Sequence, residues 1–170
     1  MLLGVLSDTH DSKDCVDDAK RRFREAGVDV VVHLGDFTSP FTLARVFEGF
    51  ENKGYCVLGN NDGDKILMRE VAGKLGIILK DYPYTINVEG RNILLMHGFG
   101  SPDNTVRIAR ALALSGVFDI VLYGHTHEAV IEKTSTTLLL NPGEASGVLG
   151  GRRTIAVIDL DSMDAEIIEL

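Results

Sequence analysis

The sequence MLLGVLSDTHDSKDCVDDAKRRFREAGVDVVVHLGD, at residues 1–36, decides the fold. An apolar run at 2–7 precedes an amphipathic segment at 12–26, and a second apolar run follows at 28–34. The amphipathic segment is acidic at its start and basic towards its end, which suits the dipole of a helix, and Gly27 provides the stop. The order strand, helix, strand predicts a crossover between two parallel strands of one sheet.

The same alternation continues and then gives way to strands. Helices are predicted at 41–50 and 64–74, with strands at 54–58 and 77–79. Beyond these, one helix is predicted at 106–114, among strand-like runs at 84–88, 92–96, 118–123, 128–133, 136–140, 153–160 and 166–170. Few helices and many strands in the second half predict two sheets packed face to face with helices outside. The expected fold is α/β, a four-layer αββα sandwich of two mixed β-sheets flanked by helices.

Five of the apolar runs end in short polar motifs, which are Asp8-Thr9-His10, Gly35-Asp36, Gly59-Asn60-Asn61-Asp62, His97-Gly98 and Gly124-His125-Thr126-His127. The C-terminal ends of neighbouring strands in an open α/β sheet border one crevice, so we expect these residues to converge. Asp, Asn and His are ligands of borderline divalent metals. Four of the five histidines lie in these motifs, and with two aspartates and one asparagine they make seven candidate ligands. Seven exceed one tetrahedral site and suit two ions that share a carboxylate.

Composition limits the function classes. With 170 residues and 45% hydrophobic content, the chain is expected to form a single domain over residues 1–170 with no cap domain. A net charge of -8 argues against binding of long nucleic acid, which depends on clustered basic residues. Only Cys15 and Cys56 are present, without a disulfide framework, which favours a reduced compartment such as the cytoplasm. No run of about 18 apolar residues occurs, so no membrane partner is expected.

The order of the five motifs resembles the calcineurin-like metallophosphoesterase family. The short length and the sequence Asn141-Pro142-Gly143-Glu144 resemble its small bacterial and archaeal phosphodiesterase branch. The resemblance implies one metal site at Asp8, His10 and His127, a bridging Asp36, and a second site at Asn60, His97 and His125. It implies a dinuclear metal-dependent phosphoric diester hydrolase that attacks small phosphodiester substrates with a hydroxide held between the ions. Mn²⁺ is the expected metal, with Ni²⁺, Mg²⁺, Zn²⁺ or Fe²⁺ as alternatives.

Asn61 and Asp62 are the candidate catalytic residues beside the ligands. Many family members have a histidine at the position of Asn61, whereas an amide donates no titratable proton at pH 7. A phenolate-like leaving group needs less help than an alkoxide, and branch members with the same loss favour diesters. Asp62 is either a turn residue or an orienter of the Asn60 loop. Phe99 is a second departure, since similar phosphodiesterases often have a histidine there.

Two other functions stay open at this point. One is a phosphomonoesterase that acts on a nucleotide or a phosphoprotein. The other is a metal-binding scaffold, because the retromer scaffold subunit resembles the same short fold but has lost metal ligands. His33 is expected to bury its ring in the core with one hydrogen bond rather than to bind metal. The natural substrate, the native metal and the oligomeric state, a homo-oligomer included, are left open by the sequence.

Overall fold

The computed structural model describes residues 1–170 as four helices and eleven strands. The helices are α1 (Lys13–Ala26), α2 (Pro40–Phe47), α3 (Lys65–Lys74) and α4 (Pro102–Leu114). The strands are β1 (Leu2–Leu6), β2 (Val30–His33), β3 (Gly54–Val57), β4 (Ile78–Lys80), β5 (Tyr84–Val88), β6 (Arg91–Met96), β7 (Ile120–Tyr123), β8 (Ala129–Lys133), β9 (Leu138–Pro142), β10 (Thr154–Asp159) and β11 (Asp164–Glu169). Every predicted helix and strand is present, with shifted ends.

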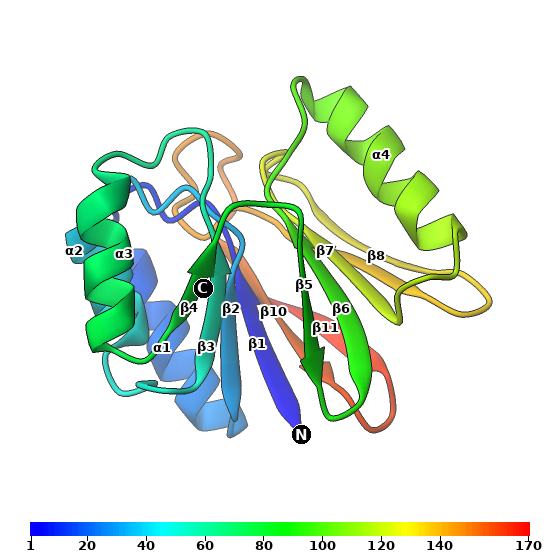
Figure 1. Cartoon of the computed structure of the whole chain (residues 1–170), viewed down its shortest axis with the longest axis horizontal. Helices are drawn as coiled ribbons and strands as arrows, with labels where there is room; N and C mark the ends of the chain where they lie inside the picture. The colour runs from blue at the N-terminus through cyan, green and yellow to red at the C-terminus, as the bar shows by residue number, and fades with distance from the viewer.

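The strands form two mixed sheets, as predicted. The first has six strands in the order β11-β10-β1-β2-β3-β4, and the second has five in the order β5-β6-β7-β9-β8. In the first sheet β1 to β4 are parallel, and β10 and β11 are antiparallel additions. In the second sheet β6, β7 and β9 are parallel, whereas β5 and β8 pair antiparallel at the two edges (Figure 1).

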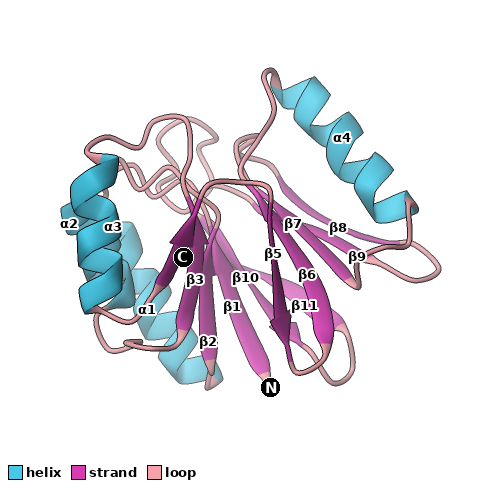
Figure 2. Ribbon diagram, in the orientation of Figure 1, coloured by secondary structure: helices cyan, strands magenta, loops and turns pink.

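Helices cover the outer faces of the two sheets. Figure 2 shows α1, α2 and α3 on the outside of the first sheet and α4 on the outside of the second. The predicted four-layer αββα sandwich is therefore confirmed. No helix in the structure has both the length and the apolar character that a bilayer crossing requires.

The central strands of the first sheet, β10, β1, β2 and β3, are buried on both faces. Val5 packs between the two sheets with Leu95 and Leu122, whereas the next residue, Leu6, packs on the helix side with Phe23. Successive side chains of a strand point to opposite faces, so a strand covered on both sides reads as an unbroken apolar run. Each fully buried side chain of this size contributes roughly 1.5–3 kcal/mol of hydrophobic stabilisation. This packing makes the strands a rigid support for the loops at their ends.

Two of the shifted element boundaries have identifiable local causes. α4 begins at Pro102 rather than at residue 106, because the Ser101 hydroxyl accepts a hydrogen bond from the Asn104 amide and the proline suits the first turn. β9 begins at Leu138 rather than at residue 136. The Thr134 hydroxyl accepts hydrogen bonds from the amides of Thr136 and Thr137, which keeps that segment in a turn.

Candidate metal centre

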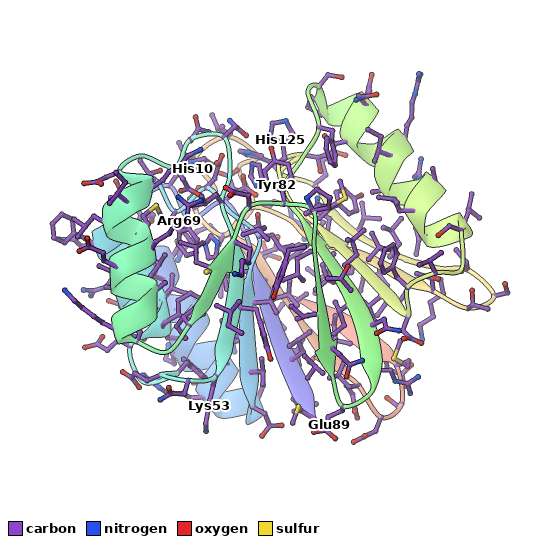
Figure 3. All side chains as sticks on the ribbon, viewed as in Figure 1. His10, Lys53, Arg69, Tyr82, Glu89 and His125 are labelled. Atoms are coloured by element: carbon purple, nitrogen blue, oxygen red, sulfur yellow. The ribbon has the colours of Figure 1, made fainter.

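The polar motifs at the strand ends meet at one edge of the sandwich. Figure 3 shows His10, Tyr82 and His125 together at this edge, with Lys53 and Glu89 at the opposite one. Two groups of side chains have ligand atoms within 4.8 Å of one another, namely Asp8, His10 and His127, and Asp8, Asp36 and His97. The predicted convergence is therefore present for five of the seven candidate ligands in these groups.

The first group surrounds the buried carboxylate of Asp8. Its Oδ1 lies 3.3 Å from Nε2 of His127 and 3.7 Å from Nε2 of His10. The other oxygen, Oδ2, accepts hydrogen bonds from the Ser7 hydroxyl and from the His125 amide. Oδ2 is thus occupied by donors of the chain, and Oδ1 is left to face the two imidazoles.

The second group lies around Asp36. Nε2 of His97 is 3.5 Å from Asp36 Oδ1 and 2.9 Å from Asn60 Oδ1. The other carboxylate oxygen, Oδ2, is 3.9 Å from Nε2 of His10 in the first group. The two oxygens of Asp36 therefore face the two groups, as a bridging ligand requires.

His125 belongs to neither of these groups. Its ring packs edge-on against His97, with the centroids 5.1 Å apart, and its Nε2 lies 2.8 Å from the carbonyl oxygen of Gly100. A carbonyl only accepts, so Nε2 carries the proton and Nδ1 has the free lone pair. The structure places His125 beside the second group with Nδ1 as its available ligand atom.

A backbone carbonyl also orients His97. Its Nδ1 donates to the Leu34 carbonyl oxygen over 2.8 Å, which leaves Nε2 as the basic nitrogen that faces Asp36 and Asn60. A hydrogen bond on the second ring nitrogen is the usual way in which proteins hold a metal-binding histidine in one orientation. The ring is fixed by residues that come from the other sheet.

Buried polar atoms without partners show that the site suits cations. Asp8 Oδ1 and His10 Nε2 are both buried and make no hydrogen bond. Leaving a charged oxygen unpaired in the interior is costly, and a bound cation removes that cost. The set of carboxylate, imidazole and amide donors is also the set that binds borderline divalent ions. The residues present therefore fit the two metal ions that the sequence predicts.

The pKa shifts in the two groups reflect the same arrangement. Burial raises the pKa of Asp36, but contacts with His97 and Asn61 outweigh burial and hold that pKa below its ordinary value. Burial lowers the pKa of His97, and the neighbouring carboxylates reverse this and raise it. The Asp8 carboxylate raises the pKa of His127. Negative charge is thus concentrated where the imidazole nitrogens converge.

The backbone of the site is strained. Five of the seven candidate ligands have left-handed φ angles, which are 57° at Asp8, 42° at His10, 59° at Asp36, 69° at His125 and 61° at His127. Such conformations cost of order 1–3 kcal/mol each in non-glycine residues and cluster at functional sites. Close approach matters as well: a Cβ at Gly59 would lie 2.1 Å from Oδ1 of Asp36. Because Gly59 has no side chain, the loops that follow β2 and β3 can come this close together.

Asn61 and Asp62 occupy different places. The Asn61 side chain donates to Asp36 Oδ2 over 2.7 Å, so it lies at the edge of the metal site. The buried Asp62 carboxylate accepts from the amides of Asp36, Thr38 and Gly59. Burial raises the pKa of Asp62, although these amides oppose the shift. The Asp62 carboxylate thus ties the loops after β2 and β3 together.

Two residues beside the site, His33 and Phe99, pack against aromatic rings, and the predicted burial of the His33 ring is confirmed. His33 is fully buried and stacks on Phe37 with the ring centroids 3.5 Å apart. Its ring makes two hydrogen bonds rather than the expected one, because Nδ1 accepts from the Gly35 amide and Nε2 contacts the Thr9 hydroxyl. Phe99 is partly buried and packs edge-on against Tyr82. Neither residue reaches the candidate ligands as a donor.

Sequence reasoning missed two residues that hold the loops after β7. Asn141 is assigned no role by the sequence beyond its place in the motif at 141–144, yet its buried amide donates to the Gly124 carbonyl and the Thr126 hydroxyl. Glu144 was noted only as part of a motif, yet its carboxylate is buried and its Oε2 lies 3.2 Å from Nδ1 of His127. The signal that could have identified Glu144 is that it is an acidic residue in a segment that is otherwise buried.

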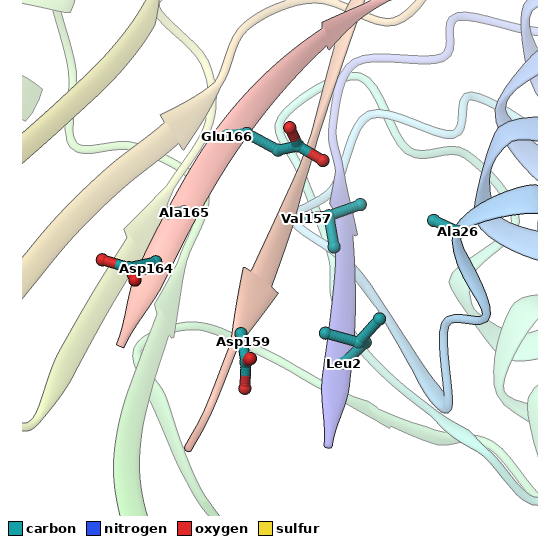
Figure 4. Close-up of a pocket in the computed structure, with 7 residues that line it drawn as sticks. All are labelled: Leu2, Ala26, Val157, Asp159, Asp164, Ala165 and Glu166. Atoms are coloured by element: carbon teal, nitrogen blue, oxygen red, sulfur yellow. The ribbon is translucent and has the colours of Figure 1, made fainter. Parts of the chain in front are cut away.

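A separate pocket lies far from this site along β1. It is lined by Leu2, Ala26, Val157, Asp159, Asp164, Ala165 and Glu166 (Figure 4). Leu2 begins β1, whereas Asp8 follows its other end, so the pocket opens at the opposite edge of the sheet. It contains no histidine or cysteine, and the candidate chemistry is confined to the strand-end cluster.

Comparison with known proteins agrees with this geometry. The calcineurin-like phosphoesterase superfamily domain matches residues 1–163. The chain is 31% identical to a phosphodiesterase of Methanocaldococcus jannaschii over 96% of both chains, and 31% identical to a probable metallophosphoesterase of Methanothermobacter thermautotrophicus over 99% of this chain and 92% of that protein.

Solved structures show the same likeness. The fold superposes on an archaeal phosphodiesterase with a TM-score of 0.86 at 31% identity, and all of both chains is covered. Vps29 of Entamoeba histolytica in complex with zinc shares the fold with a TM-score of 0.67 at 18% identity, over 99% of both chains. The chain belongs to the calcineurin-like phosphoesterase superfamily.

Proposed function

We propose that this protein is a phosphodiesterase that hydrolyses small phosphodiester substrates with two divalent metal ions. Seven residues would hold the ions: Asp8, His10, Asp36, Asn60, His97, His125 and His127. The observation that carries the proposal is the pair of buried, partnerless atoms, Asp8 Oδ1 and His10 Nε2, which lie 3.7 Å apart in one group. The names of the archaeal relatives support the choice of a diester.

The assignment of ligands follows the two groups. Asp8, His10 and His127 would hold one ion, and Asn60, His97 and His125 the other, with Asp36 shared. Two such ions, when bound, supply positive charge at the phosphoryl oxygens and lower the pKa of a shared water. Mn²⁺ is the metal we propose to test first, followed by Ni²⁺, Mg²⁺, Zn²⁺ and Fe²⁺, because the mixed oxygen and nitrogen donors do not favour a soft ion.

Asn61 and Asp62, which lie beside the ligands, would orient the site, and neither would supply a proton to the leaving group. Asn61 donates to Asp36 and orients the shared carboxylate, but its amide offers no titratable proton to a leaving group. The Asp62 carboxylate accepts hydrogen bonds from three backbone amides of the loops after β2 and β3, so Asp62 is a residue that positions these loops. A site without a proton donor at Asn61 favours esters whose leaving group is already stable as an anion.

The surroundings of the site support a small substrate. An open hollow is lined by His125 and His127 together with Pro102, Thr126 and Leu149. The segment between Asp36 and Asn60 holds only α2 and β3, so we propose one domain over residues 1–170 without a cap. The net charge of -8 favours neither long nucleic acid nor an anionic membrane surface as a partner.

The cysteines are the basis for a proposed location. Cys15 and Cys56 are both free and buried. Burial raises the pKa of the Cys15 thiol to about 11, so little of it is present as the reactive thiolate. We propose a reducing compartment, the cytoplasm, for this protein. Self-association into a homo-oligomer is tested by measuring the mass in solution.

The proposed activity is tested by comparing an aryl phosphodiester with its matched monoester in the presence of each of the five metals. We expect a higher kcat/KM on the diester, together with two bound ions per chain by elemental analysis. A higher value on the monoester would favour the phosphomonoesterase. Bound metal without turnover on either ester would favour the scaffold alternative.

A further inference from the structure

Glu144 is a fully buried acidic residue that follows β9 and lies behind the first metal group. Its carboxylate accepts hydrogen bonds from the Ser146 hydroxyl and from the backbone amides of Leu149 and Gly150. Its Oε2 is also 3.2 Å from Nδ1 of His127, which is the only basic group within ion-pair distance of it. Glu144 thus joins the loop at 146–150 to a candidate ligand.

The charge on this buried carboxylate is stabilised locally. Removing water from an ionised carboxylate is costly unless several donors replace it. Three donors come from the loop, and the only other partner of the carboxylate is the His127 ring, whose Nδ1 lies within ion-pair distance.

The ring of His127 lies between two carboxylates. Nε2 is 3.3 Å from Asp8 Oδ1 on the side of the metal group, and Nδ1 is 3.2 Å from Glu144 Oε2 on the other side. Nδ1 is buried and makes no hydrogen bond in the structure, so the approach of Glu144 to it is an ion-pair contact. A carboxylate that contacts one ring nitrogen of a histidine keeps the proton on that nitrogen. The lone pair of the other nitrogen is then free to bind a metal.

We propose that Glu144 is a positioning residue that holds His127 with Nε2 towards the first metal site and couples that site to the loop at 146–150. This inference rests on the proposed ligand role of His127. The same carboxylate fixes the amide of Leu149, whose exposed side chain lines the hollow beside His127. The orientation of the ligand and the rim of the hollow therefore depend on one buried charge.

The first test is a Mn²⁺ titration of the whole chain, with affinities at the two sites measured by calorimetry. Glu144→Gln keeps the size and an acceptor oxygen but removes the charge. We expect about 10- to 100-fold weaker binding at one site, the usual loss when the carboxylate behind a metal-binding histidine is changed, and unchanged binding at the other. Glu128→Gln is the matched control, because Glu128 is also near His127 but exposed. It should leave both affinities unchanged.

His127→Ala separates this inference from the proposed function. If His127→Ala loses one Mn²⁺ and Glu144→Gln binds both ions as tightly as the unaltered protein, the role of Glu144 is wrong and the ligand assignment stands. If His127→Ala keeps both ions, the ligand assignment itself is wrong. Equal weakening of both sites in Glu144→Gln would also overturn the inference, since a general loss of structure does not select one site.

A second measurement needs no variant at Glu144. In the Zn²⁺-loaded protein, nitrogen-resolved NMR of the histidine rings should show the proton of His127 on Nδ1, shifted downfield and slow to exchange because Glu144 accepts it. A ring proton on Nε2, or an Nδ1 proton that exchanges as fast as in free imidazole, would overturn the inference even if Glu144→Gln fails to fold.

Discussion

Nε2 of His97 lies 3.5 Å from Oδ1 of Asp36, although His97 follows β6 of the second sheet and Asp36 follows β2 of the first. The carbonyl of Leu34, two residues before Asp36, accepts the Nδ1 proton of His97. The site therefore straddles both sheets, and its geometry depends on how the sheets pack. This relationship makes Asp36 the natural starting point for mutation.

Asp36→Asn should weaken both metal sites and abolish turnover. The two carboxylate oxygens of Asp36 face different groups, and the amide keeps the shape while it removes the shared negative charge. Elemental analysis of the purified variant and kcat on an aryl diester measure the two effects. Asp14→Asn, a change at an exposed acid in α1, serves as the control. Activity with two bound ions in Asp36→Asn would rule out the shared role.

His33→Ala should leave two metals bound and lower the stability of the protein. The ring is buried, stacks on Phe37 and makes two hydrogen bonds, so its loss should cost roughly 1–3 kcal/mol in the free energy of unfolding. His97→Ala and His125→Ala should each lose one metal instead. Denaturant unfolding and metal counting distinguish the two kinds of effect. Loss of a metal in His33→Ala would place His33 among the ligands.

Chelation should lower the melting temperature, and added Mn²⁺ should restore it. Asp8 Oδ1 and His10 Nε2 are buried without partners, so a cation that binds the folded state more tightly than the unfolded state stabilises the fold. The measurement is thermal unfolding with chelator, with Mn²⁺, and with Na⁺ at equal ionic strength as the control. Identical curves in all three solutions would argue that the folded chain holds no metal.

Asn61→His should raise activity on alkyl phosphomonoesters far more than on aryl diesters. The side chain of residue 61 already reaches Asp36, so an imidazole there lies beside the metal groups and can donate a proton to a poor leaving group. General acid catalysis of this kind is typically worth about 10²-fold or more. The ratio of kcat/KM for the two esters, in both proteins, is the readout, with metal content as the control. A similar gain on both esters would contradict the proposed role of Asn61 in selecting the substrate.

The sequence by itself determined the layers and the motifs that hold the candidate ligands. Apolar runs such as 2–7 and 28–34 predict buried strands because both of their faces are covered, and the crossover through α1 requires those strands to be parallel. Since parallel strands end at one edge, the residues directly after them had to lie near one another. These inferences need only the local pattern of apolar and polar residues and the handedness of strand–helix–strand crossovers.

Tertiary structure alone decided how the candidate ligands are oriented. The proton positions on His97 and His125 depend on the carbonyls of Leu34 and Gly100, and the surroundings of His127 depend on Glu144. None of these contacts follows from a repeating pattern. The first arises because the two sheets pack together, and the other two arise between loops that follow neighbouring strands of the second sheet. These contacts bring distant backbone and carboxylate oxygens to the ring edges, which fixes where each imidazole can hold its proton and where it can bind an ion.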